Sequence, residues 1–143
     1  EKKFFFNDGH CPIHAKITPA AIDAAKAAHP GAPVLAHPEC TPAVLAKADY
    51  IGSTSGILNY ATTHDNKQFI IVTECGIGYK LRQQNPGKEF FFVEPTPCCN
   101  DMKFITPEKI AHALETGEGE VTLDEAQRRL ACAPLEKMLE LSK

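Results

Sequence analysis

The sequence predicts an α/β fold in which parallel strands form a sheet covered by helices on both faces. Short apolar runs typical of buried strands alternate along the chain with segments of helical periodicity, as in strand-helix-strand units. The chain also repeats a pattern in which an apolar strand is followed by a loop with one cysteine and then by a helix beginning with Thr-Pro. Similar units in series are therefore expected.

The apolar runs expected to form strands lie at residues 3–6, 34–36, 50–51, 68–72 and 89–93. The helices expected between them lie at residues 19–28, from 42 onward, from the 52–56 loop to 60, and at 75–84. Thr18 and Thr41 each precede a proline. Threonine at the N-cap and proline at the first helical position both favour a helix start, so these dipeptides predict where two helices begin.

The C-terminal segment is predicted to be mostly helical. A helix is expected at residues 107–115, a short strand at 121–123, and a closing helix from Asp124 that Pro134 interrupts. The apolar residues at helical spacing that we expect in a core are Leu135, Met138 and Leu139.

We predict two domains, an αβα unit over residues 1–94 and a segment over 95–143 that contributes the Cys99 loop and C-terminal helices to a further unit. The chain opens on charged residues without a methionine and enters an apolar run at once. We therefore expect it to be the back part of a longer protein.

Composition excludes several classes of protein. A chain of 143 residues, 43% of them hydrophobic, can bury one ordinary core. No apolar run approaches the roughly 20 residues that a membrane span requires. The net charge is −3 and no basic cluster is present, so nothing favours nucleic acid as a partner. We expect a soluble, cytoplasmic protein.

The six cysteines are expected to be free thiols, because the sequence has no secretion signal. It also lacks the C-x-x-C pairs from which zinc ribbons draw their ligands. Three cysteines have no equivalent in an internal repeat and are expected to be core residues: Cys40, Cys75 and Cys132.

The internal repeat singles out Cys11 and Cys99. Residues 3–22 align with 89–110, and the two cysteines are 88 positions apart, as are the residues that follow them. Cys98 would break this register. Both loops follow a predicted strand, and open α/β sheets bind ligands at the carboxyl ends of their strands.

Two other groups of polar residues suggest chemistry. His14 follows Cys11 by three positions and can add a donor from the same loop, or be a surface imidazole. His37 and Glu39 follow a strand in an extended loop, where both side chains can reach one substrate as hydrogen-bond donor and proton acceptor, or form an exposed polar loop.

The Gly-Ser-Thr-Ser-Gly loop at residues 52–56 opens a helix and offers N–H groups and hydroxyls to a phosphate or carboxylate, or simply caps the helix. Thr73 and Glu74 directly follow the strand predicted at residues 68–72, and they are a weaker example of polar residues placed at the end of a strand.

Together these motifs resemble those of the quinolinate synthase family. The matching segments are GHCPIH, HPEC, ADYIGSTSGI, IIVTECG and CNDMK followed by ITPEKI, in that order along essentially the whole chain. The resemblance implies a transferase of NAD biosynthesis that condenses iminoaspartate with dihydroxyacetone phosphate to quinolinate, with loss of phosphate and water. It also implies three αβα units about a pseudo-threefold axis, around a 4Fe-4S cluster bound by one cysteine from each unit.

Carried onto this sequence, the resemblance implies that Cys11 and Cys99 are two of the three cluster ligands. The residues that it implies for substrate binding are His14, His37, Glu39, Ser53 and Thr54, of which the first three are also expected to be catalytic.

The family's first unit, which carries the third cysteine, has no counterpart in this sequence. We expect the chain to cover the second unit and the third cysteine segment, and to need the first unit in cis or as a separate chain for activity. The alternatives are a catalytically silent αβα module that binds a small phosphorylated or dicarboxylate ligand, and a zinc-binding structural piece that the cysteine spacing disfavours.

Overall fold

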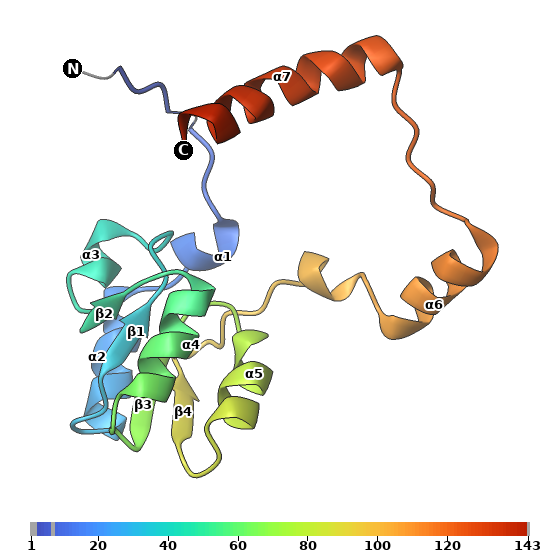
Figure 1. The fold of residues 1–143 in the computed structure, drawn as a ribbon. Helices are drawn as coiled ribbons and strands as arrows, with labels where there is room; N and C mark the ends of the chain where they lie inside the picture. The colour runs from blue at the N-terminus through green and yellow to red at the C-terminus, as the bar shows by residue number, and fades with distance from the viewer. Residues whose placement is uncertain (1–2, 7, 143) are drawn as a thin grey trace. The chain divides into compact units, whose positions relative to one another are not determined.

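The computed structural model describes residues 3–6 and 8–142, which belong to two compact units (Figure 1). The first unit is Glu1–Met102 and the second is Lys103–Lys143. All the residues expected to bind substrate or metal lie in the first unit.

Parallel strands form the sheet of the first unit, in the order β2-β1-β3-β4. The strands are β1 (Val34–Ala36), β2 (Tyr50–Ile51), β3 (Gln68–Val72) and β4 (Glu89–Phe92). The chain adds β2 on one side of β1 and then returns to add β3 on the other. The sheet therefore has a switch point between β1 and β3, the place where open α/β sheets bind ligands.

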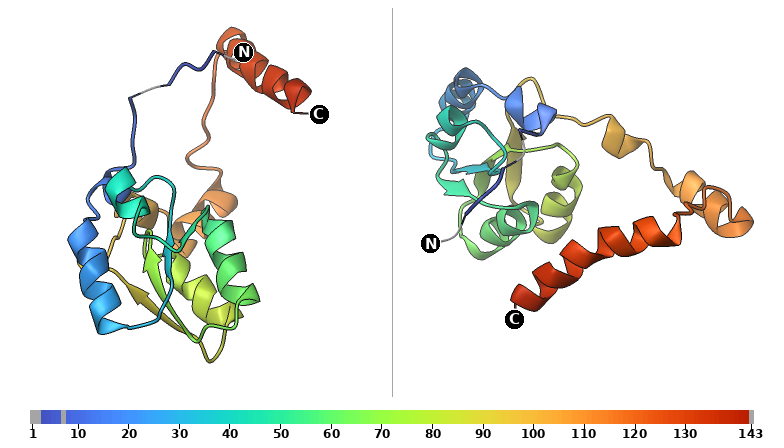
Figure 2. Two further views of the ribbon diagram at one scale, coloured as in Figure 1. Left: turned by 90° about the vertical axis from the view of Figure 1, so that its left-hand side faces the viewer. Right: turned by 90° about the horizontal axis from the view of Figure 1, so that it is seen from above.

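Helices cover both faces of this sheet and make three αβα layers, as Figures 1 and 2 show. The helices are α2 (Pro19–Ala28) and α3 (Pro42–Leu45) on one face, and α4 (Thr54–Thr63) and α5 (Ile77–Gln84) on the other. The core under α2 and α3 includes Ile22, Val34, Val44, Ile70 and Val72. The core under α4 and α5 includes Leu35, Ile57, Phe69, Ile71 and Leu81. Successive strand residues thus alternate between two buried cores, and the predicted α/β class is confirmed.

Threonines occupy the N-cap where the Thr-Pro pattern predicts, but the Thr41 side chain makes no capping hydrogen bond at α3. The Thr18 hydroxyl oxygen accepts the backbone N–H of Ala21 at 3.2 Å, at the start of α2. The Thr106 hydroxyl oxygen accepts the N–H of Lys109 at 3.4 Å, at the start of α6 (Pro107–Thr116). A short helix that the pattern did not predict, α1 (Pro12–Ala15), follows Cys11 directly.

The strand expected at residues 3–6 is not formed, and that prediction is wrong. Phe4, Phe5 and Phe6 are 71%, 93% and 86% exposed. A strand needs a neighbour for its backbone hydrogen bonds. The equivalent strand in the repeat, β4, has β3 beside it, whereas no strand of the described residues pairs with residues 3–6.

The second unit consists of α6 and α7 (Glu125–Leu141). The strand expected at residues 121–123 is absent, because no other strand lies in the described part of this unit. Pro134 does not interrupt α7 as expected. The helix is exposed at this point, so water can satisfy the carbonyl that proline leaves without a partner.

The apolar residues of α7 that we expected in a core are exposed, since this unit offers α7 no sheet to pack on. These residues are Leu135, Met138 and Leu139. No helix of the described residues is long and apolar enough to cross a bilayer.

Candidate functional site

A pocket of about 470 Å³ lies at the carboxyl ends of β1 and β3, beside the switch point of the sheet. The residues predicted for the site that line it are Cys11, His14, His37, Glu39, Thr54 and Cys99. Ser53 is outside this lining. The loop after β1 is joined to the last residue of β3 by a hydrogen bond from the His37 N–H to the Val72 carbonyl at 3.1 Å.

His14 is buried at the base of this site. The short helix α1 directs its ring inward, where Nε2 lies 2.9 Å from the hydroxyl of Thr73 at the end of β3. Its Nδ1 atom is 3.1 Å from Oε2 of Glu39, but outside hydrogen-bond geometry. Nδ1 is therefore a buried polar atom without a hydrogen bond, and it faces the half-exposed carboxylate of Glu39.

His37 and Glu39 lie closer together than an extended loop would place them. A turn closed by the Cys40 N–H and the His37 carbonyl at 3.0 Å brings Oε2 of Glu39 to 3.5 Å from Nδ1 of His37. The backbone N–H of Glu39 also donates to that Nδ1 at 3.3 Å. In neutral His37 the proton is then on Nε2, which is left as the donor.

The two imidazoles stack, with ring centroids 4.6 Å apart and planes 16° from parallel. Burial lowers the pKa of His14 below its ordinary value of 6.5, and the nearby His37 lowers it further, while Glu39 acts in the opposite direction. His14, whose neutral form burial favours, therefore lies beside the His37 ring and the Glu39 carboxyl, and these groups can accept, donate and relay protons within one pocket.

Cys11 and Cys99 bring two free thiols to this pocket from loops far apart in the sequence. Both are half-buried. Cys11 also forms, with His14 and Glu39, a group whose ligand atoms all lie within 4.8 Å of one another. This group combines one soft thiol sulfur with one imidazole and one carboxylate, which suits iron or zinc better than magnesium or calcium, and Cys99 adds a second thiol to the same pocket lining.

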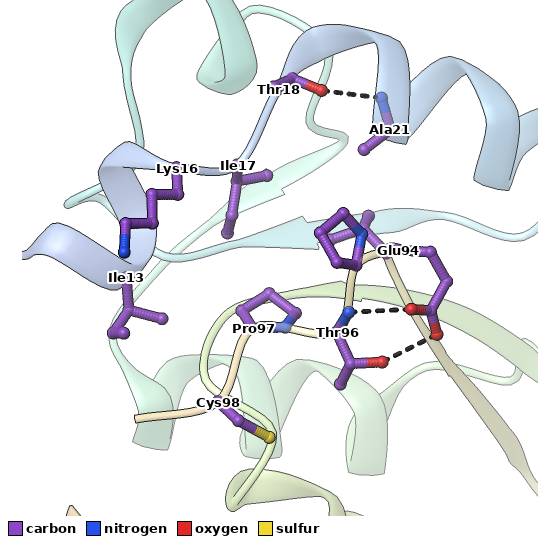
Figure 3. Close-up of a pocket in the computed structure, with 11 residues that line it drawn as sticks. Ile13, Lys16, Ile17, Thr18, Ala21, Glu94, Thr96, Pro97 and Cys98 are labelled. Carbon is purple, nitrogen blue, oxygen red and sulfur yellow. Dashed lines mark hydrogen bonds between the residues drawn. The ribbon is translucent and has the colours of Figure 1, made fainter. Parts of the chain in front are cut away.

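Cys75 and Cys98 form a disulfide, so the expectations of free cysteines throughout and of a core thiol at Cys75 are wrong. The loop after β4 passes beside the end of β3 and brings the two Cα atoms to 5.3 Å. Cys98 faces a different, smaller pocket of about 160 Å³, drawn in Figure 3. None of the predicted site residues lines that pocket.

Cys40 is buried in the core, as expected. Its thiol donates to the Val72 carbonyl at 3.7 Å, and burial raises its pKa to about 11. The thiol therefore stays protonated at neutral pH. Cys132 is free and half-buried on α7, whose described residues include none that is buried, so the expectation of a core residue is wrong for Cys132.

In the 52–56 loop, one residue caps helix α4 and another lines the 470 Å³ pocket. The Ser53 hydroxyl oxygen accepts the N–H of Gly56 at 3.2 Å and caps α4, whereas Thr54 lines the pocket. A side chain at Gly52 would come within 2.6 Å of the Tyr50 ring, so this glycine is required for close packing. Helix capping thus accounts for part of the motif.

Other residues that line the pocket were marked only weakly, or not at all, by sequence motifs. Thr73 and Glu74 were only a weak strand-end pair, yet Thr73 contacts His14, and Glu74 accepts the N–H of Cys99 at 3.2 Å. Lys80 of α5 brings an ammonium group to the pocket lining. Its position follows from the packing of α5 beside the loops, and no local motif marks it.

Comparison with known proteins adds evidence that is independent of this geometry. The family model of the quinolinate synthetase A protein matches residues 1–140. The chain is 43% identical over 147 residues to the quinolinate synthase of Aquifex aeolicus, with 99% of this chain and 46% of that protein covered.

Two further quinolinate synthases are similar to this chain. The protein of Pelobacter propionicus is 42% identical over 137 residues, and that of Clostridium novyi is 41% identical over 138 residues. Each comparison covers 96% of this chain and 45% of the relative. The chain therefore spans less than half the length of these curated relatives.

Proposed function

The chain belongs to the quinolinate synthase family, and we propose that it forms part of an active site that condenses iminoaspartate with dihydroxyacetone phosphate to quinolinate. Phosphate and water are lost in this transferase reaction of NAD biosynthesis. The observation that supports the proposal most is that Cys11 and Cys99, from two distant loops, line one pocket with His14, His37 and Glu39.

Cys11 and Cys99 would hold a 4Fe-4S cluster together with a third cysteine from a first unit, supplied in cis or by a separate chain. Both thiols are free, and thiolate sulfur is the usual protein ligand of iron-sulfur clusters. With three protein ligands, the bound cluster supplies an open iron that acts as a Lewis acid toward a hydroxyl leaving as water.

Glu39 and His37 would move protons. The Glu39 side chain is 54% exposed at the pocket, so its carboxylate can reach a substrate and accept a proton released during condensation. His37 has Nε2–H as its donor and can hydrogen-bond a substrate oxygen. His14, buried and neutral, would orient Glu39 and bind substrate through the same pocket.

Thr54, from the pocket lining, and Ser53, which stands beside it outside the lining and caps α4, would bind the anionic end of a substrate. They stand at the start of α4, a helix of ten residues whose first N–H groups have no partners within the helix. Lys80 adds a positive charge to the same lining. A phosphate or carboxylate bound there would be held by hydroxyl, amide and ammonium groups together.

The test is to mix this chain with a separately produced first unit under anaerobic conditions and to measure quinolinate formation. We expect quinolinate only when both parts and iron and sulfide are present. Binding of phosphate or of a dicarboxylate by the mixture, without iron and without quinolinate, would favour a non-catalytic binding module instead.

A further inference from the structure

Cys99 lies in an irregular stretch between β4 and a short 3-10 helix at Asp101–Lys103. Cys11, by contrast, opens α1, and its carbonyl accepts the N–H of Ala15 at 3.0 Å as the first bond of that helix. The position of Cys99 must therefore come from contacts that its loop makes with the rest of the unit.

Contacts to the residues after β3 fasten this loop. The backbone N–H of Cys75 donates to the Pro97 carbonyl at 2.7 Å, and the Cys75 side chain forms the disulfide with Cys98. The backbone N–H of Cys99 itself donates to Oε1 of Glu74 at 3.2 Å. Among these contacts, the carboxylate of Glu74 is the one that acts on Cys99 directly.

The Glu74 carboxylate is fixed at both oxygens. Oε2 accepts the N–H of Gly76 at 2.7 Å while Oε1 accepts the N–H of Cys99. Hydrogen bonds from backbone N–H groups to a carboxylate are stronger than those to neutral acceptors. The side chain thus ties the amide of Cys99 to the turn that follows β3.

We propose that Glu74 is the positioning residue of Cys99, fixing its backbone amide so that its thiol faces the pocket shared with Cys11. This inference rests on the proposed function, in which Cys99 binds iron. Glu74 acts here through Cys99 rather than on iron or substrate. Residues around metal ligands typically change metal affinity about 10- to 100-fold when they are replaced.

The experiment compares Glu74→Ala and Glu74→Gln with the matched control Glu94→Ala. The Glu94 carboxylate also accepts hydrogen bonds in the loop after β4, but from the N–H and the hydroxyl of Thr96, at 2.8 and 2.7 Å (Figure 3), and not from Cys99. A dithiol reductant is present throughout, so that the Cys75–Cys98 disulfide is open in every variant.

The first measurement is hydrogen exchange at the Cys99 amide in this chain. We expect about tenfold faster exchange in Glu74→Ala, because the N–H loses a charged acceptor, and unchanged exchange in Glu94→Ala. Glu74→Gln should fall between them, since its amide oxygen can still accept one of the two N–H groups. Unchanged exchange in Glu74→Ala would overturn the proposal.

The second measurement is iron retention against a chelator after assembly with the first unit. We expect retention to weaken about 10- to 100-fold in Glu74→Ala and not in Glu94→Ala. Faster amide exchange with wild-type retention would overturn the positioning role. If Cys99→Ser also retains iron as the wild type does, Cys99 is not a ligand, and the proposed role of Cys99 fails with the inference. If Cys99→Ser loses iron while Glu74→Ala keeps it, the inference alone fails.

Discussion

The carboxylate of Glu39 lies 3.1 Å from the Nδ1 atom of His14, although the two residues come from different loops. Glu39 reaches the pocket on a turn after β1, and His14 reaches it on α1. The contact couples a half-exposed acid to a buried base. The burial of His14 gives a first test, through the dependence of stability on pH.

Stability should depend on pH through His14. Its folded pKa is below 6.5, mainly because burial disfavours the charged ring, so between the folded pKa and 6.5 the unfolded chain binds more protons than the folded one. The free energy of unfolding should be undiminished above 6.5, fall as the pH drops below it, and level off below the folded pKa. Urea unfolding over this range measures the slope.

The variant His14→Asn should show a shallower slope than the wild type. His10→Asn, which changes an exposed histidine of the first unit, is the control and should keep the wild-type slope. An equal slope in His14→Asn and wild type would mean that His14 does not titrate in the way its burial requires.

Glu39→Gln should slow quinolinate formation by about 10² to 10⁴ in the assembled enzyme, because it removes a proton acceptor at the pocket. The melting temperature should change little, since the carboxylate is half-exposed. Glu120→Gln, at an exposed position of the second unit, is the control and should leave both quantities unchanged. A large drop in melting temperature with a proportionate loss of activity would make Glu39 a structural residue.

Thiol alkylation should separate the pocket cysteines from the core cysteine. At about pH 8, a thiol of pKa about 11 is ionised in roughly one molecule in a thousand, so Cys40 should react slowly with iodoacetamide. Cys11 and Cys99 at the pocket, and Cys132 on α7, are free and half-buried and should all react before Cys40. Peptide mass mapping over time gives the order, and early labelling of Cys40 in folded protein would contradict its burial.

The two copies of the repeat should differ in what they contribute to stability. Ile22 and Ile110 occupy equivalent positions, but Ile22 is fully buried whereas Ile110 is 51% exposed. Ile22→Ala should cost about 2–5 kcal/mol of unfolding free energy, as large-to-small changes in cores do. Ile110→Ala in this chain should cost much less. Equal losses, measured by urea unfolding, would show that the second copy is packed as tightly as the first.

The sheet could be predicted from the sequence because its strands are short apolar runs, separated by segments of helical periodicity and by turn residues such as Pro30-Gly31 and Pro86-Gly87. β1, β2 and β3 begin and end at the residues that this pattern predicts, and β4 ends at Phe92, one residue early. The Phe4–Phe6 run has the same local character but no neighbouring strand. Local sequence shows that a segment suits a strand, whereas pairing depends on what lies beside it.

Much of the site could also be placed from the sequence, because residues that follow β1 and β3 must meet at one edge of a parallel sheet. The disulfide could not, since pairing depends on the distance between the Cys75 and Cys98 Cα atoms rather than on spacing. The contact of Glu74 with Cys99 could not be predicted either, because it joins two loops that only the folded sheet brings together.

The central claim, that Cys11 and Cys99 of this chain bind iron, is tested most directly by comparing Cys99→Ser with its neighbour Cys98→Ser. The measurement is iron and sulfide content, with the brown absorbance of the cluster, after anaerobic assembly with the first unit. The account predicts that Cys99→Ser and Cys11→Ser lose the cluster and that Cys98→Ser, outside the main pocket, keeps it. A cluster that is lost in Cys98→Ser and kept in Cys99→Ser would contradict the account.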